Sequence, residues 1–181
     1  RIFDKPPAES TARSGRHSQP TRCGKARAGR SPDCKAAVSA CIRQLTPAAE
    51  RGGTTIVERC PDQLPDVRGD FSKITWVMNN LLSNAIKFTP RGGAIALTSH
   101  PEGNKVFVTV RDTGCGLDAQ SQQKMFEKFY QGDPSHAAEG NGLGLALVKK
   151  VLEIVNGEIS VRSSPGEGSA FTVVLETDAA S

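Results

Sequence analysis

The sequence of 181 residues predicts an α+β fold, built as a two-layer α/β sandwich. Segments with a strand pattern occur in pairs along the chain, and segments with helical periodicity lie between those pairs. Val106, Val108 and Val110 recur at every second position, as they would on a half-buried strand. A sheet with one apolar face has to bury it against another layer, and the predicted helices supply that layer.

The first half of the predicted domain contains two helices and one strand. A helix is predicted over residues 36–51, where apolar side chains recur at helical spacing before Gly52-Gly53. Its apolar stripe consists of Val38, Ile42, Leu45 and Ala49. A β-rich stretch over residues 54–60 predicts a strand. Asp70 is a plausible N-cap for the second helix, which we expect to end near Thr89, before Pro90.

The second half contains two strand pairs separated by helical segments. The Gly- and Ser-rich stretch over residues 130–141 predicts a mobile loop, because it has little apolar content. The other predicted elements are strands 94–99 and 106–111 around a turn at 102–104, a short helix 118–126, a helix 143–155, and strands 158–163 and 170–176 around a turn at 165–168.

The charge of the chain is unevenly distributed. Residues 1–35 carry nine Lys and Arg against three Asp and Glu, whereas the remaining residues carry fourteen against sixteen. A basic segment can indicate nucleic acid or an anionic membrane, but this one has no interleaved aromatic residues and no run of basic residues. We therefore expect residues 1–35 to be a disordered or ill-defined basic tail with no nucleic-acid partner, and residues 36–178 to form one domain.

The cysteine pattern and hydropathy bear on the compartment. Five cysteines without Cys-x-x-Cys spacing predict neither a disulfide framework nor a zinc site, and a reducing, cytoplasmic compartment is the simplest interpretation. No window reaches 18 consecutive apolar residues, so we expect no transmembrane segment in these residues, although a longer parent protein could be membrane-anchored.

The stretch Asn-Leu-Leu-Ser-Asn-Ala-Ile-Lys-Phe-Thr, residues 80–89, carries the strongest functional signal. On a helix, Asn80, Asn84 and Lys87 fall within about 60° of one another, opposite the apolar positions. Asparagines at helical spacing most often form a plain solvated face. Amide oxygens are also hard ligands for a divalent cation and lysine is a point positive charge, so the face suits a phosphate with its metal.

Three further stretches follow in order. Asp112-Thr-Gly-Cys-Gly116 places a carboxylate at a strand end, where it can accept a hydrogen bond from an exocyclic amine. Phe126-Glu-Lys-Phe129 and Gly140-Asn-Gly-Leu-Gly-Leu145 come next, and the glycines open a helix whose free N–H groups could hold an anion. Together with residues 80–89, these stretches resemble the N, G1, F and G2 boxes of one family. The family is the catalytic, ATP-binding domain of sensor histidine kinases in two-component systems, which shares its fold with gyrase, Hsp90 and MutL.

The resemblance covers roughly residues 36–176 and implies a fold, a ligand and a set of site residues. The fold implied is a mixed, mainly antiparallel sheet with helices on one face (the Bergerat, or GHKL, fold). The ligands implied are ATP and Mg²⁺, with Asn84 on the metal and Lys87 on phosphate. Asp112 would hold the adenine amino group. The other nucleotide-site residues implied are Asn80, Phe88, Gly114, Gly116, Phe126, Phe129, Gly140, Gly142, Leu143 and Gly144. The last four of these would form a phosphate lid, and Phe126 and Phe129 would hold the base of that lid.

Asn80 bears on the reaction type. Relatives that hydrolyse ATP place a glutamate here, which can deprotonate water, whereas an amide cannot act as that base. We therefore expect ATP to be bound, with Asn80 and Lys87 as catalytic residues, and its γ-phosphate kept for a protein acceptor. The partners implied are a histidine phosphoacceptor and dimerisation domain and a response regulator.

The chain itself lacks a recognisable acceptor motif. None of His17, His100 and His136 begins the family's His-Glu/Asp-x-Arg/Asn-x-Pro stretch, so an acceptor would have to be supplied in trans. Two alternatives stay open on the sequence. One is a serine kinase of the anti-sigma-factor type, which also uses an Asn-x-x-x-Asn helix. The other is a module that senses ATP or ADP without transferring phosphate.

Overall fold

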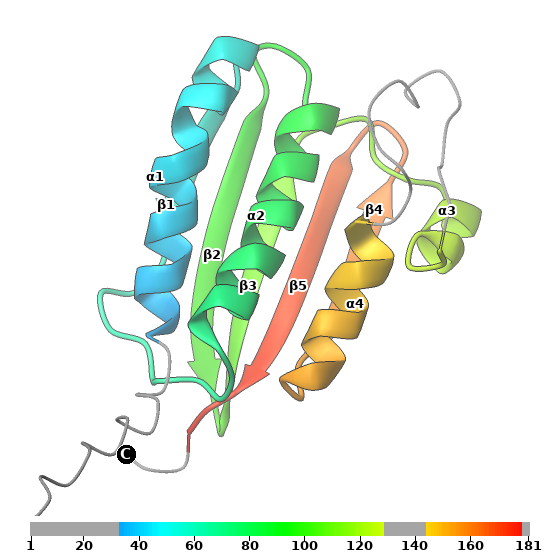
Figure 1. Cartoon of the computed structure of the whole chain (residues 1–181). Helices are drawn as coiled ribbons and strands as arrows, with labels where there is room; N and C mark the ends of the chain where they lie inside the picture. The colour runs from blue at the N-terminus through cyan, green and yellow to red at the C-terminus, as the bar shows by residue number, and fades with distance from the viewer. Residues whose placement is uncertain (1–32, 129–143, 179–181) are drawn as a thin grey trace, which may run out of the picture. The chain divides into compact units, whose positions relative to one another are not determined.

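A computed structural model describes residues 33–128 and 144–178, which form a five-stranded sheet with helices packed on one face (Figure 1). The strand order is β1-β2-β3-β5-β4. β1 runs parallel to β2 and every other neighbouring pair is antiparallel. The strands are β1 (Thr55–Arg59), β2 (Ala94–Glu102), β3 (Lys105–Asp112), β4 (Glu158–Ser164) and β5 (Gly168–Glu176). The predicted two-layer fold with a mixed, mainly antiparallel sheet is confirmed.

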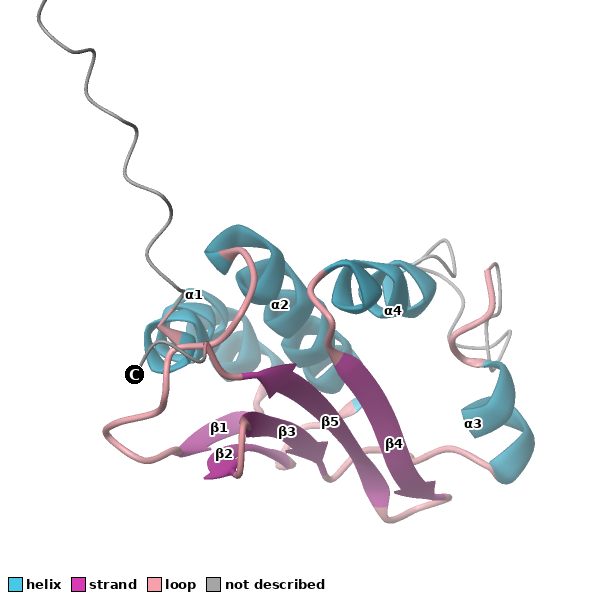
Figure 2. Ribbon diagram, turned by 90° about the horizontal axis from the view of Figure 1, so that it is seen from below, coloured by secondary structure: helices cyan, strands magenta, loops and turns pink. Residues whose placement is uncertain are grey.

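Three of the helices cover one face of the sheet, and the other face carries no helix among the described residues (Figure 2). The covering helices are α1 (Cys34–Gly52), α2 (Phe71–Phe88) and α4 (Gly144–Ile154), while the short α3 (Ala119–Lys124) lies beside β4. Aspartates begin three helices: Asp33 accepts from Ala36 N at 3.0 Å, and Asp70 and Asp118 cap α2 and α3 in the same way. The N-cap predicted at Asp70 is confirmed, with Lys73 N as its donor at 3.0 Å.

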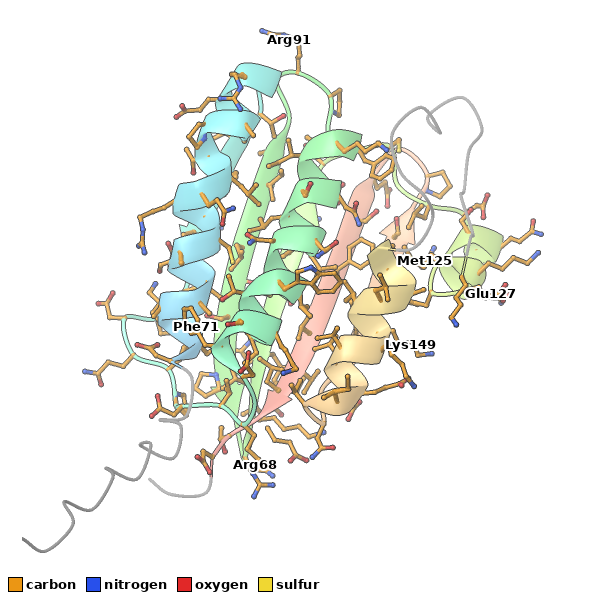
Figure 3. All side chains as sticks on the ribbon, viewed as in Figure 1. Arg68, Phe71, Arg91, Met125, Glu127 and Lys149 are labelled. Carbon is orange, nitrogen blue, oxygen red and sulfur yellow. The ribbon has the colours of Figure 1, made fainter. Side chains whose placement is uncertain are left out.

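The core lies between the helices and the sheet. Side chains of α2 at helical spacing meet alternate side chains of the central strands, and the largest fully buried ones include Met78, Leu81, Leu82, Leu97 and Leu175. Burying each such side chain contributes about 2 kcal/mol. Met125, which follows α3, also joins this core (Figure 3). The cysteines of α1 are buried core residues: burial raises the pKa of Cys34 to about 12 and that of Cys41 to about 11.

One element boundary differs from the sequence prediction by three residues. The strand predicted to end at residue 99 continues through His100 and Pro101 to Glu102. Pro101 is tolerated because β1 pairs only with residues 94–98 of β2, so the proline lies where β2 has a free edge and needs no N–H on that side. The remaining elements begin and end within two residues of their predicted bounds. The two-residue differences include the end of α3, predicted at residue 126 and found at Lys124, and the start of β5, predicted at residue 170 and found at Gly168.

No helix among the described residues combines the length and apolar character needed to cross a membrane. The predicted tail up to residue 32 and the predicted loop at 130–141 lie outside the described residues.

Candidate nucleotide site

The amide face predicted on residues 80–89 lies on α2, opposite its buried stripe. Asn80 and Asn84 are half-buried, and Lys87 and Phe88 are exposed in the last turn. The buried stripe consists of Ile74, Val77, Met78, Leu81, Leu82 and Ala85. The helix therefore has the two faces that the periodicity predicted.

Asn80 is oriented by a hydrogen bond within α2. Its Nδ2 donates to the Trp76 carbonyl at 2.8 Å, one turn earlier. The reverse orientation of the amide would set two oxygens against each other, so Nδ2 lies toward Trp76 and Oδ1 remains as the acceptor. That oxygen faces α4: a Cβ built on Gly144, the first residue of α4, would lie 3.6 Å from it.

Lys87 and Phe88 are positioned together at the end of α2. The Lys87 Nζ lies 5.4 Å from the centroid of the Phe88 ring, within range of a cation–π contact. Phe88 is 41% exposed, and two other aromatic side chains of α2, Phe71 and Trp76, are exposed to similar extents. The backbone at this point also adjoins the loop after β3, because a Cβ on Gly114 would come within 2.4 Å of the Phe88 carbonyl oxygen.

Asp112 is a buried carboxylate at the end of β3. Its Oδ1 accepts from the backbone N–H of Gly114 at 2.8 Å and of Ser169 at 3.2 Å. Burial raises the pKa of Asp112, and the two backbone hydrogen bonds oppose that rise. Since both bonds fall on one oxygen, the second carboxylate oxygen remains available to a donor such as an exocyclic amine.

The glycines of this region allow backbone segments to approach Asp112 closely. Gly116 has φ of 70°, and a Cβ there would lie 1.9 Å from the Ser164 carbonyl oxygen. Gly168 has φ of 84°, and its Cβ would lie 2.0 Å from the carbonyl oxygen of Asp112 itself. Both positions therefore require glycine for space as well as for conformation.

A hydrogen-bond network runs from this carboxylate to α3. The Ser163 hydroxyl lies 2.9 Å from the Ser169 hydroxyl, donates to Gly168 O at 2.8 Å and accepts from Leu117 N at 2.8 Å. Gln122 on α3 donates its Nε2 to Ser163 O at 2.9 Å and to Leu117 O at 3.0 Å. The loop after Asp112 is thus fixed at both ends.

Sequence reasoning did not identify Gly168, Ser169, Ser163 or Gln122. The sequence predicts the turn at 165–168 only as a connection between two strands. The available signal was Gly168 followed by the hydroxyl residue Ser169 at the start of a strand. The local sequence does not predict that this strand pairs with the strand that ends at Asp112.

The other predicted site residues fall into two groups. Phe126 is half-buried and packs against the core. Phe129, Gly140, Gly142 and Leu143 lie outside the described residues. Within the described part, three segments therefore adjoin one another: the end of β3, the polar face of α2 and the start of α4.

The donors at this site fit a hard divalent cation held together with a phosphate. Residues 33–128 and 144–178 contain no group of three or more His, Cys, Asp or Glu that could hold a metal by themselves. The amide oxygens of α2 are neutral, hard donors, and a cation bound through few protein ligands and phosphate oxygens is typical of Mg²⁺.

Comparisons with known proteins agree with this geometry. Residues 69–179 match the family of histidine kinase-, DNA gyrase B- and HSP90-like ATPases. The chain is 37% identical over 145 residues to an uncharacterized sensor-like histidine kinase, R01002, of Rhizobium meliloti (strain 1021). That alignment covers 79% of this chain but only 28% of the relative, so the chain spans a minor part of that protein's length.

Two solved structures extend the comparison. Full-length ShkA in complex with AMPPNP has a TM-score of 0.72 at 28% identity, over 83% of this chain and 32% of that one. The histidine kinase ThkA in complex with the response regulator protein TrrA has a TM-score of 0.67 at 21% identity, over 80% of this chain and 40% of that one. On the match over residues 69–179, the chain belongs to the histidine kinase-, DNA gyrase B- and HSP90-like ATPases, and its fold is that of the catalytic domain of sensor histidine kinases.

Proposed function

We propose that this domain binds ATP with Mg²⁺ and donates the γ-phosphate to a histidine on a phosphoacceptor domain, in two-component signalling. The observation that carries the proposal is the buried carboxylate of Asp112, which has one oxygen committed to two backbone N–H groups and the other available. The adenine amino group would donate to that second oxygen. Membership of an ATPase family supports the identity of the nucleotide.

The triphosphate would extend from Asp112 along α2 toward α4. Lys87 would contact phosphate, and the exposed ring of Phe88 would lie near the nucleotide. Gly144 begins α4, where free backbone N–H groups and the helix dipole favour an anion. Phe129, Gly140, Gly142 and Leu143 stay predicted members of the lid, and Phe126, packed on the core, would anchor the lid's base.

Asn84 is the proposed magnesium ligand, and Asn80 faces the same region with its amide oxygen. When bound, the cation would neutralise charge on the phosphate oxygens as the phosphoryl group leaves. The face of α2 that carries both amides holds no carboxylate to deprotonate a water molecule. Hydrolysis should therefore be slow relative to transfer, which favours a kinase over an ATPase.

The acceptor would be supplied in trans or by a part of a longer protein. A ring nitrogen of its histidine would bond to the γ-phosphorus as the bond between that phosphorus and the bridging oxygen breaks, releasing ADP. The phosphoryl group would then pass to a response regulator, a partner that the complex of ThkA with TrrA supports. A cytoplasmic setting, where ATP and such partners occur, fits this reaction. We also propose residues 36–178 as the folding unit, extended to Asp33 because Asp33 caps α1 and Cys34 is buried in the core.

The test combines labelled ATP, Mg²⁺ and a phosphoacceptor hairpin from a sensor histidine kinase. We expect an acid-labile, base-stable phosphate on the hairpin, and much less label at subsaturating ATP when Asp112→Asn replaces the parent domain. An acid-stable phosphate would instead indicate a serine kinase. Nucleotide binding without transfer to any acceptor would indicate a sensing module, and either result would overturn the proposal.

A further inference from the structure

The sheet face opposite the helices is uncovered by any described helix (Figure 2), and many of its residues are polar. Strand register aligns them in two neighbouring rows across the sheet. The first row reads Arg162, Ala170, Arg111, Ala96 and Val57, and the second reads Ser160, Thr172, Thr109, Thr98 and Arg59. We call these ten residues the arginine–hydroxyl face.

The three arginines of this face are exposed, and none forms an ion pair with another described residue. The acidic residues of the same sheet face lie toward its other end. There Glu158 pairs with Lys105 at 3.3 Å, and Glu176 pairs at 3.5 Å with Arg68, which is labelled at the lower end of the view in Figure 3. Glu167 lies in the turn beyond the first row. The positive charge of the two rows is therefore uncompensated within them.

The side chains between the arginines suit an extended anionic ligand. Two alanines separate Arg162, Arg111 and Val57 in the first row, so each guanidinium can lie flat on the sheet. The second row presents hydroxyl groups, two of which, on Thr109 and Thr172, lie 2.8 Å apart. Arg162 and Arg111 are two strands apart, about 10 Å. Residues three positions apart in a polyproline II segment would span about that distance on one side of the peptide.

The aromatic residues of this sheet face argue against single-stranded nucleic acid as its ligand. His100 and Phe107 stack on each other, with ring centroids 5.1 Å apart and planes within 6°. Each ring therefore has one face covered by the other, whereas base binding uses open aromatic faces as platforms. Arginine forks also match carboxylates in two-point hydrogen bonds.

We propose that the arginine–hydroxyl face binds an acidic polypeptide segment of a partner protein, through carboxylates on Arg59, Arg111 and Arg162. The chain's own first 32 residues have the wrong sign for this role, since they hold eight Lys and Arg against two Asp and Glu. The face lies across the sheet from the helices that carry Asn80 and Gly144, so a bound segment leaves the nucleotide site uncovered. The proposal does not depend on the function proposed above.

The test titrates the domain with a glutamate-rich peptide of about 15 residues, long enough to cross the sheet. We expect Arg111→Glu/Arg162→Glu to weaken binding about tenfold or more, and the parent's affinity to fall with salt. The matched control, Arg43→Glu/Arg51→Glu, makes the same charge change on exposed positions of α1 and should alter affinity less than about twofold.

Three results would overturn the proposal. They are equal loss of affinity in both double variants, no binding of the peptide by the parent domain at millimolar concentration, and tighter binding of an oligothymidylate than of the peptide. Circular dichroism of each variant verifies the fold. If the double variant is unfolded, the single variant Arg111→Gln gives a second measurement, because it removes one positive charge without adding a negative one.

Discussion

The amide oxygen of Asn80 on α2 faces Gly144, the first residue of α4. A methyl group added at Gly144 would lie 3.6 Å from that oxygen. The hydrogen bond from Asn80 Nδ2 to the Trp76 carbonyl fixes this orientation. A neutral acceptor is thereby held against a helix start, where backbone N–H groups favour an anion. The relationship places Asn80, which we propose sets the reaction type, beside the start of α4.

Replacing Asn80 by glutamate should turn the domain toward hydrolysis. A carboxylate at this position can take a proton from water, and general-base catalysis contributes about a hundredfold or more when well placed. We expect Asn80→Glu to release phosphate from ATP without an acceptor at least about tenfold faster than the parent. Asn79→Glu, on the neighbouring face toward α1, is the control. Unchanged hydrolysis by a variant that still binds ATP would contradict the role assigned to Asn80.

Asn84→Ala should remove the magnesium-dependent part of nucleotide binding. The variant deletes the proposed ligand but leaves the buried stripe of α2 intact. We expect affinity for ATP to fall about tenfold or more with Mg²⁺ present and to change little in EDTA, as calorimetry can measure. Ser83→Ala, an exposed neighbour, should behave as the parent does. Equal affinity of Asn84→Ala and parent with Mg²⁺ would remove Asn84 from the site.

Gly168→Ala should destabilise the domain by about 3 kcal/mol, because it combines left-handed strain with a backbone clash. The added Cβ would lie 2.0 Å from the Asp112 carbonyl oxygen. Gly166 provides a matched control in the same turn: its φ is 79°, but a Cβ there meets nothing within 4 Å. Gly166→Ala should therefore cost only about 1 kcal/mol, the price of the conformation. Urea denaturation compares the two, and equal costs would refute the clash.

The sequence predicted those features that depend on local periodicity. The two faces of α2 follow from the spacing of Asn80, Asn84 and the apolar residues, and the start of α2 follows from Asp70. These signals lie within one or two helical turns, so a single stretch of chain determines them.

The support around Asp112 could not be predicted in the same way. Ser169 donates to Asp112 from 57 residues away, and Gln122 reaches Ser163 across 41 residues. Those contacts depend on the pairing of β5 with β3 and of β4 with β5, which alternation within one strand does not specify. For the same reason, the sequence predicts Gly168 only as a turn residue.

Asp112→Asn should separate nucleotide binding from stability. Asparagine keeps an oxygen that can accept from Gly114 N and Ser169 N, but its amino group would oppose the adenine amino group. Because the two opposed amino groups would lack acceptors, we expect the free energy of ATP binding to weaken by about 2 kcal/mol, or about thirtyfold in affinity for ATP. Folding should not suffer, since the variant buries no charge.

The pH dependence of stability tests the same residue. The pKa of Asp112 is raised in the folded state, mainly by burial, so the folded protein holds a proton that the unfolded chain releases. Its ionisation therefore lowers stability as pH rises from the ordinary aspartate pKa through the raised one. Relative to Asp112→Asn, the parent should lose stability over that interval and stay less stable at pH 7.

Asp118 is a control because its pKa is shifted in the direction opposite to that of Asp112. It is exposed, and the hydrogen bond from Ser121 N lowers its pKa, so its contribution to stability is present at neutral pH and is lost on acidification. Asp118→Asn should therefore be less stable than the parent at neutral pH, and this difference should shrink on acidification. Thermal melts of both variants, from below the ordinary aspartate pKa up to pH 7, distinguish the two carboxylates. A parent that becomes more stable than Asp112→Asn as the pH rises would show that Asp112 is held as a stabilising charge and not as a desolvated one.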